Sequence, residues 1–318
     1  MKKLFTRNAL ITLILMAVSF VVVEVLIQAN IITAYYQITL ATICINIIMA
    51  VSLNLVTGFT GQFSLGHAGF MSIGAYTCGI ITVANPTVGG FLTGIVMGAV
   101  LAALAGIIIG IPTLRLKGDY LAIATLGFAE IIRIIVQTLD ITGGAAGLNG
   151  VPKFTNWPWF WFFTVLTIIL VNNFIHSSHG RACIAIREDE IAAEAMGINT
   201  TKYKVMAFAV GAFFAGIGGA LYASTFFFLK PATFGFLKSI DYLVIVVLGG
   251  MGSITGSVVA GIFLAVVNTV LAEFTAVRMI IYAALLVVVM IFRPQGLMGS
   301  KEITFKLLQK KPQSDKQE

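Results

Sequence analysis

Charged residues are sparse in this chain, and their densest group lies between residues 187 and 204. The stretch REDEIAAEAMGINTTKYK holds seven charged side chains, whereas all 318 residues together hold 20 Lys and Arg and 13 Asp and Glu. Residues 187–196 are rich in Ala and Glu and predict a short helix, and Gly197 is placed to end it. Three small alanines at 192, 193 and 195 would let this helix enter a cleft in another protein.

Two glycine-rich segments carry polar side chains. GFTGQFSLGHAGF (58–70) contains Gln62, Ser64 and His67, and LGGMGSITGS (248–257) contains two serines and a threonine. Irregular backbone at membrane depth is tolerated only where protein or a water-filled cavity satisfies it, and transporters use broken helices to bind charged substrates. The segments are therefore either parts of a polar route or glycine-rich cytoplasmic turns. In a polar route, Gln62, Ser64 and His67 would contact the substrate.

Further polar side chains lie inside apolar runs. Asn46 and Asn54 are eight residues apart, hence on roughly one face of a helix. They either line a polar route or hydrogen-bond a neighbouring helix. Glu130 and Arg133 are three residues apart, so they can neutralise each other on one helix. Glu130 then either forms a structural ion pair or lines the substrate route.

The sequence predicts neither a catalytic site nor a metal site. The three histidines are His67, His176 and His179. The last two lie near Cys183, but a metal site needs a fuller ligand set with supporting hydrogen bonds. The phosphate-binding pattern G-x-x-x-x-G-K-[ST] is missing from the sequence. We therefore expect no catalytic residue, no metal and no cofactor, and any ATP hydrolysis would belong to a partner.

Composition places the chain in a lipid bilayer. It is 58% hydrophobic and 10% charged, with mean hydropathy +0.99, whereas soluble domains average about 25% charged residues. The net charge of +7 could indicate a nucleic-acid ligand. The better explanation is the accumulation of Lys and Arg on the cytoplasmic side of membrane proteins, so we expect lipid and no nucleic acid around this chain.

The expected fold is all-α, a polytopic membrane bundle of about 8–10 transmembrane helices. Apolar runs predict helices at 9–28, 37–56, 66–84, 91–111, 120–138, 157–175, 205–229, 239–251, 258–273 and 278–292. The run 239–251 is short for a bilayer core of ~30 Å. It and 258–273 are either two spans or a re-entrant pair.

The charge distribution orients the bundle. With the N-terminus inside, 15 of the 20 Lys and Arg residues lie on the cytoplasmic side and four lie outside. This bias predicts that both termini are cytoplasmic. We expect a single membrane domain over 1–318, with a cytoplasmic loop at 176–204 and a basic cytoplasmic tail at 300–318.

Small residues recur every fourth position in two of the predicted helices. One stripe runs from Gly94 to Gly110, and the other from Ala207 to Ala223. Such faces allow close approach of helix backbones in lipid. They pack either inside the chain or against another subunit.

Several motifs resemble the membrane subunits of branched-chain amino acid ABC importers, and in particular the LivM-like member of their permease pair. They are TGFTGQFSLGHAGF, RLKGDYLAIATLGFAEIIRI, TGGAAGLNGVP, GRACIAIREDEIAAEAMGI, VVLGGMGSITG and FRPQGLMG, which occur in the family's order over roughly 57–299. The resemblance implies that 176–204 is a coupling loop. Its contacts to an ATPase would come from Glu188, Asp189, Glu190, Ala192, Ala193, Glu194, Ala195 and Gly197, although the family's Glu-Ala-Ala pattern is only loosely kept.

The resemblance also implies partners and a location. These are a second homologous permease, two cytoplasmic ATPase subunits and an extracytoplasmic substrate-binding protein, in the plasma membrane of a prokaryote. The transported substrate would be leucine, isoleucine or valine. Urea-importer permeases resemble the same family, and a self-sufficient channel or ion-coupled carrier would need no partners, so both alternatives stay open.

Overall fold

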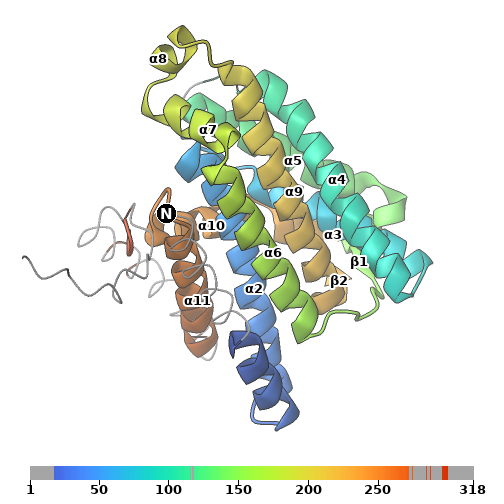
Figure 1. Ribbon diagram of the computed structural model, residues 1–318. Coiled ribbons are helices and arrows are strands. Elements are labelled where there is room, and N and C mark those ends of the chain that lie inside the picture. Colours follow the sequence, from blue (N-terminus) through green and yellow to red (C-terminus); the bar gives the residue numbers. More distant parts are fainter. Residues whose placement is uncertain are drawn as a thin grey trace, which may run out of the picture.

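The structure of the protein is a computed structural model that describes residues 18–114, 116, 118–271, 274, 284, 287 and 296–299. Within these ranges the chain is a bundle of long helices with one short antiparallel strand pair (Figure 1). The helical segments are Val18–Gln28, α2 (Ala34–Asn54), the π-helix η1 (Leu55–Phe59), α3 (His67–Ala84), α4 (Val88–Thr113), α5 (Asp119–Thr138), α6 (Trp157–His176), α7 (Ser178–Glu188), α8 (Glu190–Ala195), α9 (Thr200–Phe226), α10 (Phe236–Gly249) and α11 (Ile254–Val270).

Short elements fill the connections. Three 3₁₀ turns are Asp140–Thr142, Gly144–Ala146 and Pro231–Phe234. Strand β1 (Leu148–Asn149) pairs with β2 (Phe228–Leu229), with Leu148 opposite Leu229. This pairing ties the segment after α5 to the segment after α9.

Seven of the described helical segments are long and apolar enough to cross a membrane, which confirms the predicted helical membrane bundle. They begin near the predicted positions, and the span predicted from 239 extends back to Pro231–Gly249. Val18–Gln28 and Ile254–Val270 are shorter apolar helices. The predicted helix 278–292 and the tail 300–318 lie outside the described residues, apart from single positions, so the number of spans stays a prediction.

Helix starts follow local signals. The hydroxyl of Thr87 accepts a hydrogen bond from Gly90 N at the start of α4, and Asn199 accepts one from Lys202 N at the start of α9. Ser253 does the same for α11. Such caps satisfy backbone N–H groups that a helix leaves unpaired in its first turn.

The core is a slab formed by α3, α4 and α9, which pack through the two small-residue stripes. A Cβ atom built on Gly98 of α4 would lie 2.9 Å from Gly74 O of α3, and one on Gly219 of α9 would lie 2.0 Å from Met71 O of α3. On α4, a Cβ at Gly106 would lie 2.8 Å from Ala212 Cβ. The stripes therefore pack inside the chain at these positions, which decides between the two alternatives for them.

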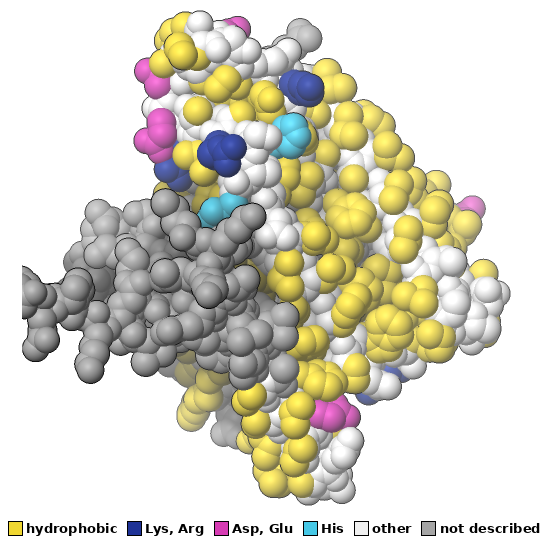
Figure 2. Space-filling model, in the orientation of Figure 1, with side chains coloured by type: hydrophobic (Ala, Val, Ile, Leu, Met, Phe, Trp, Pro, Cys, Tyr) yellow, Lys and Arg dark blue, Asp and Glu magenta, His cyan; other side chains and the backbone are white. Residues whose placement is uncertain are grey.

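The two ends of the bundle differ. Helices α7 and α8 lie together at one end, which we call the α8 end, and β1 and β2 lie at the opposite end, which we call the β end (Figure 1). Figure 2 shows charged side chains gathered around the α8 end, above a broad hydrophobic surface on the same face. A hydrophobic belt below a charged end is the surface expected of a membrane-spanning bundle.

Candidate functional site

The charged block folds as two helices, so the prediction of one helix over 187–196 is wrong. Helix α7 ends at Glu188, and α8 begins at Glu190. Asp189 between them has an extended backbone, and its carboxylate accepts hydrogen bonds from Ile191 N and Ala192 N at 2.9 and 3.0 Å. The aspartate therefore caps α8, which is why the two helices do not continue into one. We call residues 178–197 the coupling segment.

The helix stop at Gly197 is confirmed. Its backbone has φ +84°, a left-handed conformation that favours glycine. Gly197 N donates to Glu194 O, and Ile198 N donates to Ala193 O at 3.1 Å. These bonds satisfy carbonyls at the end of α8, as in the usual glycine C-cap.

The alanines of α8 do not share one environment. Ala193 is buried against the rest of the chain, whereas Ala192 and Ala195 are exposed. Two large apolar side chains here are largely exposed, Ile191 at 76% and Met196 at 82%. Sequence reasoning missed both, although an isoleucine and a methionine within a charged block were a visible signal of an apolar contact surface.

An ion pair holds α8 against the start of α9. The Lys204 ammonium donates to Glu190 Oε1 at 2.7 Å, and the Lys204 residue is only 8% exposed. Removing Glu190 would leave a buried ammonium group without this carboxylate, which is costly. Glu190 is thus an anchor of α8, whereas Glu188 is more exposed and pairs with Arg187 of α7.

The three polar side chains of the first glycine-rich segment are all buried at the junction of η1 and α3, but they face different surroundings. His67 Nε2 lies 2.8 Å from Ser52 Oγ of α2, and Ser64 Oγ accepts from Gly66 N at 3.4 Å. Gln62 is 2% exposed, and neither its amide oxygen nor its amide nitrogen has a hydrogen-bond partner. Buried amides without partners are rare, so Gln62 is the polar group of this segment that is available to a ligand or to water.

Gln62 borders a cavity of about 230 Å³ beneath the coupling segment. We call it the inner cavity. Its wall contains Gln62 and Leu121 on one side and Arg187, Glu190 and Lys204 on the other. The structure therefore brings the first glycine-rich segment and the charged block together, which their separation in the sequence did not reveal.

The two asparagines of α2 are both buried. Asn54 Nδ2 donates to Ser253 O and Ser257 Oγ, each at 2.8 Å, and its Oδ1 accepts from Gly252 N at 2.9 Å. The amide of Asn54 is thus occupied in fastening the second glycine-rich segment to the end of α2, which favours the structural interpretation for this residue. Asn46 is 7% exposed on the same helix.

Glu130 makes the predicted ion pair on α5. The Arg133 guanidinium donates to Glu130 Oε1 through Nε at 2.7 Å, and its Nη1 donates to Gln137 Oε1 at 3.1 Å. The Glu130 side chain is 42% exposed. The pair therefore lies on the surface of this chain rather than in its core, and a neighbouring subunit can contact it there.

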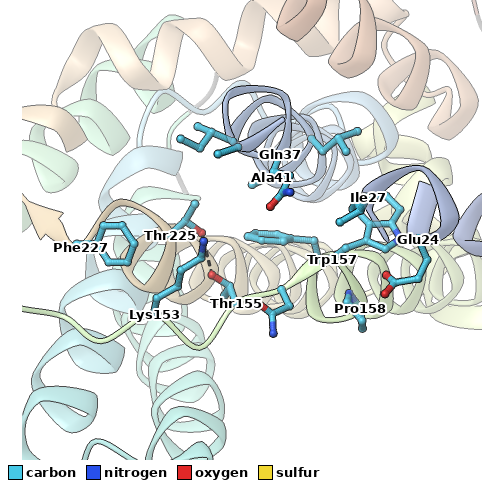
Figure 3. A pocket seen from close by; sticks show the side chains of 15 residues that line it. Glu24, Ile27, Gln37, Ala41, Lys153, Thr155, Trp157, Pro158, Thr225 and Phe227 are labelled. Carbon is cyan, nitrogen blue, oxygen red and sulfur yellow. Dashed lines mark hydrogen bonds between the residues drawn. The ribbon is translucent and has the colours of Figure 1, made fainter. Parts of the chain in front are cut away.

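A second cavity, of about 350 Å³, lies toward the β end, and we call it the outer cavity. Its wall comes from Val18–Gln28, the start of α2, the start of α6 and the end of α9. Figure 3 shows Trp157 in the middle of the wall, with Glu24 on one side and Lys153 on the other, and Gln37 on α2 near the Trp157 ring. Charge of both signs beside apolar rings is suited to a small zwitterion.

No metal site gathers in the described part of the chain, where no three His, Cys, Asp or Glu side chains come together. His176 Nδ1 lies 2.8 Å from Asn172 O, and Cys183 is buried in α7 with Sγ 3.7 Å from Tyr203 O. Burial raises the pKa of the Cys183 thiol to about 11. Cys183 thus behaves as a packed side chain of the coupling segment, and His176 is an exposed residue at the end of α6.

Comparison with known proteins identifies the family. The family model described as the branched-chain amino acid transport system permease component matches residues 35–292. The permease LivM of Salmonella typhimurium is 37% identical over 83% of this chain and 70% of its own length, and LivM of Escherichia coli is 38% identical over the same shares. The permease LivH of E. coli is 26% identical over 80% of this chain and 92% of its own length.

No solved structure matches the chain. The family match covers most of the sequence, and it agrees with the helical membrane bundle described above. It makes the protein a transport subunit rather than an enzyme. The chain belongs to the family of branched-chain amino acid transport system permease components.

Proposed function

We propose that this chain is one of two different permease subunits of an ATP-driven importer for leucine, isoleucine and valine in the inner membrane of a prokaryote. The relatives carry the names of high-affinity branched-chain amino acid transport permeases. Both LivM and LivH resemble this chain, which supports a pair of homologous permeases. Two cytoplasmic ATPase subunits and an extracytoplasmic binding protein complete the proposed importer.

One observation carries this proposal, namely the way α8 is presented. It is anchored from below by the buried Ala193 and by the ion pair of Glu190 with Lys204. Ile191 within α8 and Met196 directly after it are largely exposed. Large apolar side chains held in a water-facing position favour a protein partner, because exposed apolar residues of this kind mark interaction surfaces.

The proposed docking surface refines the expected set of contact residues. Ile191 and Met196 insert into the ATPase, and Ala192, Glu194 and Ala195 lie beside them on the exposed surface of the segment. Asp189, Glu190, Ala193 and Gly197 fix the shape and the position of α8 instead. The α8 end is then cytoplasmic, and the β end faces the binding protein.

The translocation path is proposed to run along this chain between the two cavities. Gln62 supplies a free amide near the α8 end, and Glu24 and Lys153 supply opposite charges near the β end. Asn46, Ser64, His67 and Glu130 remain proposed path residues for states in which the bundle opens. Asn54 stays in its structural role in the state described.

Reconstitution of the complete importer tests the proposal. Proteoliposomes that contain this chain, its companion permease and the two ATPases should take up leucine only when binding protein and ATP are both supplied. Uptake by this chain alone, driven by a sodium or proton gradient, would show a self-sufficient carrier instead. Uptake of urea in place of the three amino acids would assign the chain to the related urea importers.

A further inference from the structure

Arg187 joins the coupling segment to the interior of the bundle. It is the next-to-last residue of α7, and its Nη1 donates a hydrogen bond to the backbone oxygen of Gly58 at 2.8 Å. Gly58 lies in η1, the π-helix that ends α2. Short π-helical turns are rare and concentrate at functional sites. The Arg187 Nε also donates to Glu188 Oε1 at 3.1 Å, which orients the guanidinium.

Three glycines build the slot that receives this side chain. A Cβ atom on Gly61 would lie 2.9 Å from Arg187 Cγ, and one on Gly252 would lie 3.0 Å from Arg187 Nη1. A Cβ on Gly58 would lie 2.3 Å from Gly252 N and would overlap the Asn54 amide oxygen at 1.8 Å. We call Gly58, Gly61 and Gly252 the arginine slot. Larger residues at these positions would displace the arginine or separate the walls of the slot.

The arginine slot is tied to three helices. Asn54 at the end of α2 holds Gly252, Ser253 and Ser257 through its side-chain amide. These residues form the turn between α10 and α11 and the first turn of α11. The guanidinium of Arg187 therefore contacts, in one place, the end of α2 and the connection of α10 with α11. Both glycine-rich segments that stand out in the sequence contribute a wall.

We propose that Arg187 is the positioning residue that transmits movement of the coupling segment to α2, α10 and α11, and that its contact with the slot stays closed throughout the transport cycle. This inference rests on the proposed function, because it assumes that an ATPase moves α8. The Arg187 side chain is 34% exposed, but Gly58 and Asn54 beneath it are buried, and closely packed groups transmit displacement rather than absorb it. A shift of α7 and α8 thus carries the slot with it, and this shift moves the helix ends that border the interior.

The first test separates transmission from docking. In the importer isolated with its companion subunits, Arg187→Ala should leave ATPase co-purification and ATP hydrolysis in place while leucine uptake per ATP falls about tenfold, the value of a charge-assisted hydrogen bond. Arg187→Lys keeps a donor and should give an intermediate loss. Arg181→Ala is the matched control on the same helix. Arg181 is exposed, and its described hydrogen bond goes to the backbone oxygen of His176, at 2.9 Å. It should leave uptake per ATP unchanged.

The second test replaces the contact with a covalent bond. A Cβ atom at Gly61 would lie 3.5 Å from Arg187 Cβ, which is within the range of a disulfide. Gly61→Cys with Arg187→Cys, in a background with Cys44, Cys78 and Cys183 changed to alanine, should be uncoupled when reduced. Oxidation to the disulfide should restore uptake per ATP, whereas Gly61→Cys alone should not respond to oxidation.

Three results would overturn the inference. The first is wild-type uptake per ATP in Arg187→Ala. The second is that hydrolysis, thermal stability and uptake all fall together in both Arg187 variants, and the third is that the disulfide blocks transport. The last result would show a contact that must open. Failure of the wild-type importer to couple uptake to ATP would instead count against the proposed function, so the two failures are distinguishable.

Discussion

At the scale of single residues, one amide has the greatest structural consequence. Asn54 is fully buried and makes three hydrogen bonds across the boundary between α2 and the α10–α11 connection. Buried donors and acceptors that lose a partner cost about 1–3 kcal/mol each. The polar atoms around Asn54 are therefore more sensitive to substitution than the charges on the surface of α7 and α8.

Asn54→Ala is expected to destabilise the protein by ~1–3 kcal/mol, because it leaves Gly252 N without its acceptor, whereas the Ser253 carbonyl keeps its bonds from Ser257 N and Oγ. Thermal unfolding in detergent, followed by circular dichroism, measures the change. Ser257→Ala is the milder comparison: it removes one of the three Asn54 bonds and the bond from Ser257 Oγ to Ser253 O, which still accepts from Ser257 N, and it should cost about 1 kcal/mol. Equal stability of Asn54→Ala and wild type would contradict the structural role.

Cys183 is expected to be inert toward thiol reagents at neutral pH. Burial raises its pKa to about 11, so fewer than about one thiol in a thousand is ionised at pH 7.5, and only the thiolate reacts. Maleimide labelling of a variant that keeps Cys183 alone should be slow and should rise with pH toward that value. Ala195→Cys in a background without cysteines is the exposed control. Rapid labelling of native Cys183 at pH 7.5 would be inconsistent with its burial.

At the scale of elements, local signals predicted what local geometry determines. Gly197 was predicted to end α8 because a glycine C-cap depends only on neighbouring residues. The break at Asp189 was missed because its helix-start signal stands inside a continuous run of helix formers. The contact of Arg187 with Gly58 spans 129 residues, and that of Asn54 with Ser253 spans 199, so neither leaves a local trace in the sequence.

The exposed apolar face of α8 gives the sharpest prediction for an element. Changing Ile191 and Met196 together to serine should abolish co-purification of the ATPase and lower uptake by at least about tenfold, because truncated anchor residues typically cost 2 kcal/mol or more in a protein interface. Membrane insertion and thermal stability should not change, since both side chains are exposed. Ile141→Ser, at a 65% exposed position beyond α5, is the control and should bind the ATPase normally. Undiminished co-purification with the double variant would exclude α8 as the docking element.

A bulky charged residue at Ala193 would not test docking, because that side chain is buried against its own protein. The substitution would move α8 itself and would confuse misfolding with lost contact. Removal of the Glu190 carboxylate would also move α8, because it breaks the ion pair with the buried Lys204. Removal of the more exposed Glu188 carboxylate is a milder change.

At the scale of the whole molecule, composition and charge predicted the class of fold and an orientation. The structure adds that the charged coupling segment and the strand pair lie at opposite ends of the bundle. Seven apolar spans were recognisable because the need to satisfy every backbone group in lipid forces long apolar helices. The two cavities were not recognisable from the sequence, because each is assembled from segments far apart in the chain.

The orientation can be tested with single cysteines on the two ends, in a background without native cysteines. Ala145→Cys near the β end should react with a membrane-impermeant thiol reagent in right-side-out vesicles, and Ala195→Cys should react only in inverted vesicles. Both native alanines are exposed. A reporter fused after Glu318 should likewise be cytoplasmic, although that residue lies outside the described part. The reverse labelling pattern would place the coupling segment away from the ATPases and would defeat the proposed arrangement.

The slab of α3, α4 and α9 has a consequence for how the protein is made. Residues 114–199 separate α4 from α9, so a ribosome that adds about 5–20 residues per second completes α4 roughly 4–17 s before α9 begins. During that interval the part of the α4 stripe around Gly106 and Gly110 lacks its final neighbour α9, whereas Gly94 and Gly98 can already pack on α3. Because this face carries only Gly and Ala, it exposes no polar side chain while it waits. The lack of large and polar side chains on this stripe permits close packing in the finished bundle, and it also lets the newly synthesised helix enter the membrane before α9 is made.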